Sequence, residues 1–411
     1  MQTGSDEMKS AMLKLVWIAR LTVEMLQLPA LLLLALLSRL ANRPIDVGLG
    51  PLPMINNVYH KRALQQQGYS AETFVNSIYF ITQEFDRKFI ARTRVGRVLI
   101  NGVHLSFLAA LFRYRCLYLY FNGGPLGATV LLWRFEPLLL SVAGIRSVLM
   151  PYGIDVQVLT RSPNLMFRHA MARDYPAYRF VRRNTAAKID LWTWRATHVI
   201  SGCDWVDYMY FWHTLMLAHF SIDTQRWRPV PATVSRPQNG PFRVLHAPNH
   251  KAIKGSQFFV KAVEDLRAEG RNIELVLVQK RSNDEIRALM AEVDLVADQL
   301  IIGWYAMFAI EAMAMAKPVL CYLRDDLKRL YIDAGLVEEA EIPLIQCTPA
   351  SVKETLRRLM DDHEALADAA HRGPAYVQRH HSTESVGRVF AAINQSIGLM
   401  PRGGVLGAPA T

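Results

Sequence analysis

Two stretches in the carboxyl-terminal half of this 411-residue chain carry residue types that could hold a phosphate group. In the first, Lys254 precedes Gly255 at the start of a predicted helix, Ser256–Ala268. A lysine at this place opposes the positive end of the helix dipole, so an anion bound there would justify it. The lysine and the free backbone N–H groups of the helix start would hold a phosphate together. The alternative is a solvated lysine without a ligand.

The second stretch begins at Gly303, after a predicted strand, and continues as a predicted helix over residues 307–315. Glu311 lies early in this helix, where a carboxylate is favourable for structural reasons alone. In nucleotide-binding folds, an acidic residue also accepts hydrogen bonds from ribose hydroxyls. The sequence therefore allows both a structural and a ribose-binding interpretation of Glu311.

The second stretch resembles the donor-binding motif of GT-B glycosyltransferases of family four (group 1), the bacterial polysaccharide type. That motif has two glutamates separated by seven residues, and then Ala-Met-Ala and Lys-Pro. Glu311 matches the second glutamate, residues 312–314 match Ala-Met-Ala, and residues 317–318 match Lys-Pro. Residues 254–255 are similar to the family's phosphate-binding lysine and glycine, and residues 222–229 to the segment that leaves the first domain.

The resemblance implies that Lys254 contacts the donor diphosphate and that Glu311 binds the ribose. Backbone N–H groups before the second helix would receive phosphate oxygen atoms, and the Gly50 loop would face the donor. Similar enzymes generally retain the anomeric configuration and need no metal, because cations and N–H groups offset the leaving-group charge. We therefore expect no cofactor and no metal. The predicted donor-binding residues are Gly50, Asn249, His250, Lys254, Gly255, Gln299, Gly303, Tyr305, Ala306, Met307 and Glu311.

Two positions depart from the family's motif. The first glutamate, usually assigned to the hydroxyls of the donor sugar, falls on Gly303. The arginine expected five residues before Lys254 falls on Asn249. Two explanations of these departures stay open: loss of activity, or compensation by other residues. The compensating residues would be His250 or Lys251 for the charge and Gln299 or Asp298 for the sugar.

Short apolar strands alternate with helices over most of the chain, which predicts α/β structure. With the resemblance, we expect two doubly wound Rossmann-like domains facing a cleft, the GT-B arrangement, preceded by an amphipathic helical segment. Residues 122–124 and 152–155 come after predicted front-domain strands, at the end where parallel sheets bind ligands. Asp155 is therefore a third catalytic candidate beside Lys254 and Glu311, with a purely structural role in its loop as the alternative.

Changes in composition predict the domain boundaries. A linker is indicated by Pro229, Pro231, Pro237 and the closing Asn239-Gly240. The predicted segments are a helical segment 1–43, an acceptor domain 44–222, the linker 223–240, a donor-binding domain 241–380, a helix 381–400 and a flexible tail 401–411.

The net charge of +11 comes from the front half of the chain. Residues 1–240 carry 27 Lys+Arg against 14 Asp+Glu, and residues 241–411 carry 20 against 22. The basic residues would meet a lipid diphosphate, anionic headgroups or only solvent. No nucleic-acid-binding motif accompanies them, so we expect no nucleic-acid partner. They include Arg87, Lys88, Arg92, Arg94, Arg97, Arg179, Arg182, Arg183 and Lys188.

Residues 8–40 are strongly apolar, but their longest uncharged run, residues 25–38, contains Pro29. Because a membrane-crossing helix needs about 20 apolar residues, we predict that this segment does not cross. An amphipathic helix lying on a membrane, or packed on the protein itself, fits the pattern. No signal-peptide cleavage site is present after it, and the four cysteines form no CxxC pair, so we expect a cytoplasmic protein at the inner face of the membrane. One polar arc gathers Lys9, Ser10, Lys14, Arg20, Glu24 and Gln27.

Together these features predict a hexosyltransferase-type glycosyltransferase. It would move a sugar from a nucleoside-diphosphate donor to a hydroxyl of a lipid-linked or saccharide acceptor in surface-polysaccharide or glycolipid assembly. Two alternatives stay open: a catalytically silent GT-B partner in a polysaccharide assembly complex, and a sugar-nucleotide epimerase built on the same pair of sheets.

Overall fold

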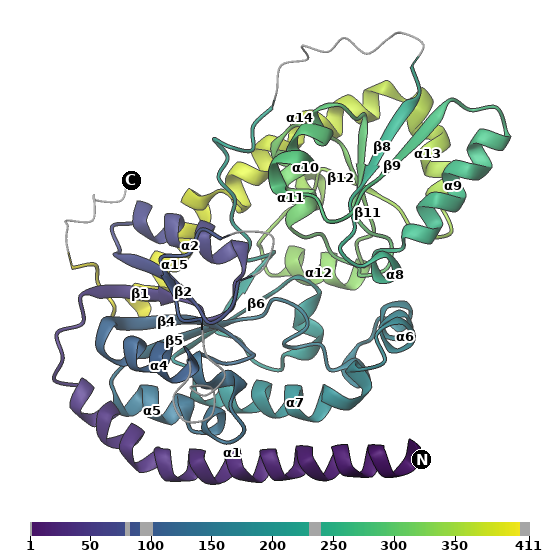
Figure 1. Ribbon diagram of the computed structural model, residues 1–411. Helices are drawn as coiled ribbons and strands as arrows, with labels where there is room; N and C mark the ends of the chain where they lie inside the picture. Colours follow the sequence, from purple (N-terminus) through teal and green to yellow (C-terminus); the bar gives the residue numbers. More distant parts are fainter. Residues whose placement is uncertain (1, 79–82, 91–101, 230–239, 403–411) are drawn as a thin grey trace.

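The computed structural model describes residues 2–78, 83–90, 102–229 and 240–402, with side chains except at residues 2–10 and 179. The chain forms two α/β domains, here called the front domain and the back domain (Figure 1). A long amino-terminal helix lies along the base of the front domain. All described strand pairs within the two main sheets are parallel.

The front domain contains a seven-stranded sheet in the order β3-β2-β1-β4-β5-β6-β7. Its central strands are buried along nearly their whole length, as expected when helices cover both faces of a parallel sheet. The strands are β1 (Ile45–Leu49), β2 (Ala71–Val75), β3 (Arg87–Lys88), β4 (Tyr114–Tyr120), β5 (Arg146–Met150), β6 (His198–Gly202) and β7 (Thr214–Met216). The helices are α2 (Ile55–Gln66), α4 (Gly102–Arg113), α5 (Glu136–Val142), α6 (Leu165–Asp174) and α7 (Tyr178–Arg195), and the 3-10 turns are η1 (Pro125–Ala128), η2 (Leu132–Arg134), η3 (Leu159–Arg161) and η4 (Cys203–Tyr208).

The back domain contains a five-stranded sheet in the order β12-β11-β10-β8-β9. Its strands are β8 (Phe242–His246), β9 (Ile273–Leu277), β10 (Leu295–Ala297), β11 (Val319–Cys321) and β12 (Leu344–Gln346). Its helices are α8 (Lys251–Lys254), α9 (Ser256–Ala268), α10 (Asn283–Ala291), α11 (Met307–Ala314), α12 (Asp325–Asp333), α13 (Val352–Asp361) and α14 (His363–His380), with a 3-10 turn η5 (Glu339–Glu341).

The strand orders fix where ligands can bind. In the front sheet the order of winding reverses between β1 and β4, and in the back sheet it reverses between β8 and β10. At such a reversal the loops after the two strands diverge to opposite faces and leave a crevice for a ligand. The loops after β1, β4, β8 and β10 are therefore the places where a site is expected.

The carboxyl-terminal helix returns to the front domain. Helix α14 packs on α11 and α13 of the back domain, whereas α15 (Thr383–Ser396) packs on α2. At the crossing point Ile222 N–H donates to the carbonyl of His381, and Thr383 N–H donates to the carbonyl of Ile222. The two chain crossings between the domains are thus hydrogen-bonded to each other.

The amino-terminal helix α1 (Gln2–Ser38) is continuous through Pro29 and packs on α4, α5 and η2. Its inner stripe carries Glu24, Leu31, Ala35 and Ser38, all buried. The Glu24 carboxylate accepts hydrogen bonds from the N–H groups of residues 130, 131 and 132, at the start of η2. The polar side of this helix therefore faces the protein where it is docked.

The structure confirms the two parallel α/β sheets and the extra amino-terminal helix. Its residues Ala11–Ser38 are long and apolar enough to cross a membrane by length and composition. The length of this apolar helix was underestimated from its longest uncharged run, residues 25–38, because isolated charges do not interrupt a helix. The sequence did not predict the strands β3, β7 and β12 or the helices α4, α5, α6, α7, α8 and α12. Of the predicted segments, Arg92, Arg94, Arg97, residues 230–239 and residues 403–411 lie outside the described residues.

We expect Gly387→Ala to destabilise the protein. Helix propensity alone would stabilise α15 by about 1 kcal/mol, because alanine favours helices over glycine. In α15, however, a Cβ at Gly387 would lie 2.6 Å from the backbone oxygen of Ala63 in α2. Overpacking of this kind costs about 1–3 kcal/mol, so the net loss is up to about 2 kcal/mol and the thermal unfolding midpoint should fall by up to roughly 4 °C. The exposed Gln395→Ala on the same helix is the control, and a raised midpoint for Gly387→Ala would contradict the packing described.

Candidate functional site

Lys254 and Gly255 lie where the chain passes from β8 to α9. Gly255 has φ of +75°, a left-handed conformation that favours glycine. Lys254 Nζ lies 2.7 Å from Oδ1 of Asp298, which is buried directly after β10. This pair joins the ends of two strands at the reversal point of the back sheet. The Lys254 side chain is 17% exposed, so the protein does not enclose its ammonium group completely.

The start of α9 is held by the buried His246 at the end of β8. His246 Nδ1 lies 2.7 Å from the carbonyl oxygen of Ala297, and Nε2 lies 2.8 Å from Ser256 Oγ. Because a carbonyl only accepts, Nδ1 carries the proton and Nε2 accepts from the Ser256 hydroxyl. Burial lowers the pKa of His246 to about 4, so the ring is neutral at pH 7. The imidazole thereby fixes the first residue of α9 beside Lys254.

The backbone before α11 offers unpaired donors. The N–H groups of Tyr305, Ala306 and Met307 donate to no other described residue, and Met307 is the first residue of the helix. No side chain caps this helix start. Free N–H groups at the positive end of a helix dipole form an anion-binding arrangement.

Gln299 gives the preceding loop its shape. Its Oε1 accepts hydrogen bonds from the N–H groups of Ile302 and Gly303, at 2.7 and 3.3 Å. Its Nε2 donates to the carbonyl oxygens of Trp304 and Tyr322, at 3.2 and 2.6 Å. The side chain is fully buried, so this amide is used by the backbone of the protein.

Glu311 is buried in α11 with 6% of its surface exposed. Within the described part of the chain, no group donates a hydrogen bond to its carboxylate. Burial raises the pKa of Glu311 to about 8, and the charge of Arg226 opposes this rise. Burial also raises the pKa of Tyr59 in α2, and the Glu311 carboxylate adds to that rise. Glu311 therefore lies at the joint of the two domains, and its carboxylate can accept hydrogen bonds from a ligand.

The position of the family's first glutamate is closed to any side chain. Gly303 has φ of +96°, and a Cβ there would lie 2.6 Å from Cδ of Arg324. The Arg324 guanidinium donates to Asp207 of η4 and to Asp326 of α12. Burial would lower the pKa of Arg324, but the hydrogen bonds that it donates to these two carboxylates outweigh burial and raise the pKa. An ion pair between the domains thus occupies the space beside Gly303.

Asn249 and His250 come after β8 and are exposed. His250 Nδ1 lies 3.0 Å from the hydroxyl oxygen of Tyr175, in the front domain. Burial, and then the charge of Lys254, lower the pKa of His250, so this ring does not replace the missing arginine charge at neutral pH. Lys251 beside it is exposed.

In the front domain, Asp155 is enclosed and Gly50 lies against β2. The Asp155 carboxylate accepts N–H hydrogen bonds from Phe121, Tyr152 and Gly153, which joins the loops after β4 and β5. Burial raises its pKa to about 7, and these bonds oppose the rise. A Cβ at Gly50 would lie 2.2 Å from the carbonyl oxygen of Phe74, so no side chain fits there.

The structure gathers most of the predicted donor-binding residues at the carboxyl edge of the back sheet, in the loops after β8 and β10 and at the start of α11. Asp155 is separate from them. Sequence reasoning missed the front-domain acids of η4, Asp204 and Asp207, and their partner Arg324. Each comes shortly after a strand end, which was the available signal. In the described ranges, no three His, Cys, Asp or Glu side chains gather as metal ligands.

No protein-family model matches this sequence, and no curated protein matches it. Several solved structures resemble the fold. HepE of Anabaena, in complex with UDP-glucose, has a TM-score of 0.58 at 14% identity, over 85% of this chain and 99% of that chain. The sucrose-phosphate synthase of Thermosynechococcus elongatus has a TM-score of 0.56 at 10% identity, over 86% and 99%. A glycosyltransferase of Rickettsia africae has a TM-score of 0.55 at 10% identity, over 87% and 99%. The chain has the two-domain GT-B fold of glycosyltransferases.

Proposed function

We propose that this protein is a glycosyltransferase with a nucleoside-diphosphate sugar as donor. The solved structures of this fold include HepE with UDP-glucose and HepE with UDP and glucose, which supports a UDP-sugar as the donor class. In this proposal the donor lies at the carboxyl edge of the back sheet, and the acceptor enters from the front domain. The transferred sugar is a hexose, its anomeric configuration is retained, and no metal takes part.

The observation that carries the proposal is the buried Glu311 carboxyl group with no donor among the described residues. The residue is only 6% exposed, so little water reaches this carboxyl group, and two vicinal ribose hydroxyls would satisfy it better. The unpaired N–H groups at the start of α11 and the ammonium of Lys254 lie at the same sheet edge. They match a diphosphate, which is anionic and accepts several hydrogen bonds.

These groups determine the chemistry. As the acceptor oxygen bonds to the anomeric carbon, the bond to the diphosphate oxygen breaks, negative charge grows on the leaving group, and the proton of the acceptor hydroxyl passes to the leaving diphosphate. Lys254 and the N–H groups before α11 would stabilise that charge in place of water. Asp298 holds Lys254 in position, because its carboxylate contacts the ammonium from the protein side.

A catalytically silent GT-B partner protein is the second candidate. It is favoured by the absence of a side chain at Gly303 and by the Arg324–Asp207 ion pair that fills the adjacent space. Such a protein would bind a nucleotide and transfer no sugar. An epimerase, in contrast, would interconvert donor sugars without an acceptor. Mass spectrometry of donor and acceptor mixtures distinguishes all three.

We expect the double variant Lys254→Ala/Asp298→Asn to bind UDP about 10- to 100-fold more weakly than the unmodified protein, because one charge-assisted phosphate contact is lost. Asp298 is changed as well, so that no unpaired charge is left buried. Isothermal titration calorimetry measures the affinity. Lys261→Ala, with its side chain 75% exposed on α9, is the matched control. Equal affinity in the double variant would refute a diphosphate site at Lys254.

UDP-glucose affinity should rise with pH up to about pH 8 and then level off. Hydroxyl donors favour the ionised form of Glu311, so binding lowers the pKa from the value of about 8 in the free protein and releases a proton. Below that value, affinity should rise by up to about tenfold per pH unit. UDP-glucose is the probe because its diphosphate has no proton to lose in this range. Glu311→Gln should show a flat profile, and a profile unchanged from that of the unmodified protein would exclude Glu311 as the group responsible.

We propose that the enzyme lies on a membrane through the outer face of α1. This face carries Leu26, Leu33 and Leu37, which are 75%, 58% and 52% exposed, beside Leu36, and the exposed Leu40 follows the end of the helix. Burying this apolar surface in lipid is favourable, and the basic front domain would be attracted to anionic headgroups. Because Glu24 and the inner stripe are docked on the protein, α1 would lie along the membrane surface instead of crossing it.

The membrane proposal predicts that Leu33→Ser/Leu37→Ser reduces flotation with phosphatidylglycerol vesicles several-fold, because each change removes about 1–2 kcal/mol of apolar burial. Both residues are exposed, so the fold should remain intact. Ile154→Ser/Met400→Ser, which changes two exposed apolar residues elsewhere, is the control. Flotation equal to that of the unmodified protein would rule out this face as the lipid contact.

A further inference from the structure

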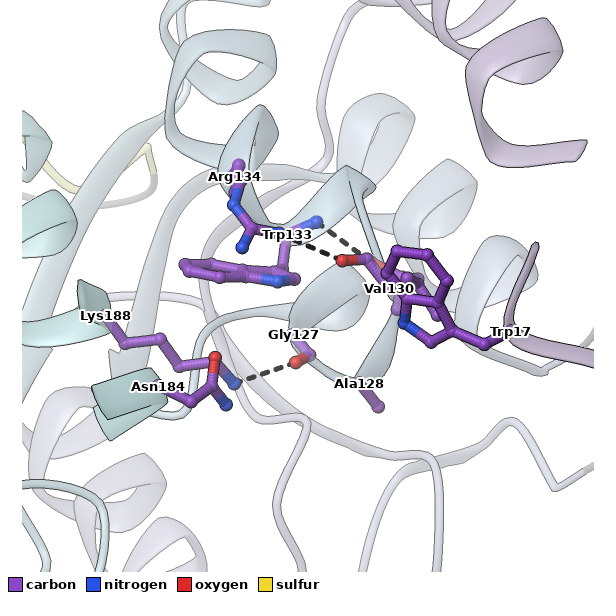
Figure 2. Close-up of a pocket in the computed structure, with 9 residues that line it drawn as sticks. Trp17, Gly127, Ala128, Val130, Trp133, Arg134, Asn184 and Lys188 are labelled. Atoms are coloured by element: carbon purple, nitrogen blue, oxygen red, sulfur yellow. Dashed lines mark hydrogen bonds between the residues drawn. The ribbon is translucent and has the colours of Figure 1, made fainter. Parts of the chain in front are cut away.

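A cavity of about 400 Å³ lies between α1 and the front domain (Figure 2). Trp17 of α1 forms one wall, the η1–η2 segment forms the floor, and α7 closes the opposite side. None of the predicted donor-binding residues lines it. The lining residues are Trp17, Gly127, Ala128, Thr129, Val130, Trp133, Arg134, Asn184 and Lys188.

Lys188 places a buried cation at this cavity. Lys188 is 8% exposed, and its Nζ donates to the carbonyl oxygens of Asn122 and Gly127, at 2.8 and 2.9 Å. Among the described residues, no carboxylate lies within 4.0 Å of this ammonium group. Burial lowers the pKa of Lys188, and the charges of Glu136 and Asp155 offset this fall only in part, so an anion in the cavity would further stabilise the charged form.

Arg134 places a second cation at the same cavity. Its guanidinium carbon lies 4.4 Å from the ring centroid of Trp133, and Lys188 Nζ lies 5.5 Å from that centroid. Arg134 donates to the carbonyl oxygen of Val130, and no described carboxylate forms an ion pair with it. One indole therefore lies near two cations that form no ion pair with the described residues (Figure 2).

Two acidic groups of this region already accept hydrogen bonds from the backbone. Glu24 accepts three N–H groups at the start of η2. Glu136 accepts from the N–H groups of Gly124 and Leu126, and burial raises its pKa to about 7. Neither carboxylate forms an ion pair with Lys188 or Arg134, although the charges of Glu136 and Asp155 favour the charged form of Lys188. The ammonium and the guanidinium groups therefore give the cavity a positive lining.

The surroundings of the cavity indicate an amphiphilic ligand. Trp17, 52% exposed, is flanked on α1 by Leu13 and Ile18, which are 67% and 53% exposed. A ligand with its anionic group between Lys188 and Arg134 could extend an apolar chain along these residues. Lys188 also holds the carbonyl of Asn122, which lies just after β4 at the reversal point of the front sheet. The cavity is thus connected through one residue to the predicted acceptor side of the site.

We propose that this cavity binds the phosphate group of a membrane lipid or lipid-linked acceptor, with the lipid chain against the amino-terminal half of α1. The binding itself is independent of catalysis. The assignment of the cavity as an acceptor site rests on the proposed glycosyltransferase function. Both the membrane lipid and the lipid-linked acceptor carry a phosphate group on a lipid chain.

The test is calorimetric titration of the full-length protein with dihexanoyl phosphatidic acid below its micelle concentration. Dihexanoyl phosphatidylcholine and inorganic phosphate are titrated in parallel. We expect phosphatidic acid to bind at least about tenfold more tightly than either, because only it combines an unshielded phosphate with a chain. Inorganic phosphate binding as tightly would overturn the lipid assignment, and no phosphatidic acid binding would overturn the site.

Arg134→Gln and Trp17→Ala should each weaken phosphatidic acid binding about tenfold, through loss of a charge-assisted contact and of an apolar wall. Both residues are exposed, so either variant carries the test if the other fails to fold. Arg329→Gln, with its side chain 84% exposed on α12, and Trp194→Ala, 79% exposed, are the matched controls. Affinities of Arg134→Gln and Trp17→Ala within twofold of the unmodified protein would overturn the proposal.

UDP-glucose titrations on the same samples separate the two proposals. Arg134→Gln and Trp17→Ala should leave UDP-glucose affinity unchanged, since neither residue lies in the back domain. Failure of the unmodified protein to bind UDP-glucose, with phosphatidic acid binding intact, would refute the proposed function and leave the lipid site. A lipid-linked acceptor is distinguished from a bulk membrane lipid by competition: an undecaprenyl-type diphosphate should displace phosphatidic acid only if the acceptor uses this cavity.

Discussion

The joint between the two domains depends on how buried charges are compensated. Arg324 and Asp207 each keep only 8% of their side-chain surface exposed, and they belong to different domains. A buried ion pair adds little net stability, but removing one partner leaves an uncompensated charge at a cost of about 3–5 kcal/mol. The pair therefore restricts the relative placement of η4 and the β11–α12 turn. Lys254 and Asp298 impose the same restriction on the ends of β8 and β10.

Glu311 differs from these groups because its carboxyl group has no ionic or hydrogen-bonding partner among the described residues. Its raised pKa is the direct consequence, since burial without compensation favours the neutral form. Asp204 shows the intermediate case: burial and the nearby Asp207 raise its pKa to about 7, while Arg324 and Lys254 lower it. The pKa values of the acids at this joint thus depend on how far neighbouring charges and hydrogen-bond donors compensate the burial of each carboxyl group. The least compensated of them is the one that gains most from a ligand with hydroxyl groups.

Much of this architecture is encoded in local sequence pattern. Short apolar runs bounded by Gly, Pro and Asn predicted strands such as β1, β5, β6 and β8, because parallel strands are buried on both faces. The motif around Glu311 predicted the position of α11. The packing of Arg324 beside Gly303 was not predictable, because it depends on a side chain 21 residues away along the chain folding over a glycine. The edge strands β7 and β12 were not recognised because only one of the three residues in each is buried, whereas the equally short β10 and β11 are buried throughout.

The amino-terminal helix shows why periodicity alone does not determine which face is solvated. The helical pattern correctly gathered Glu24 and Gln27 on one side, and a surface helix would turn that side to water. Here Glu24 instead compensates three backbone N–H groups more than 100 residues away, at the start of η2. Burying one carboxylate against a short helical turn leaves the leucines on the outside. The apolar outer face is therefore a consequence of the polar contact beneath it, and any ligand between α1 and α7 meets a cationic wall on the protein side and an apolar edge on the other.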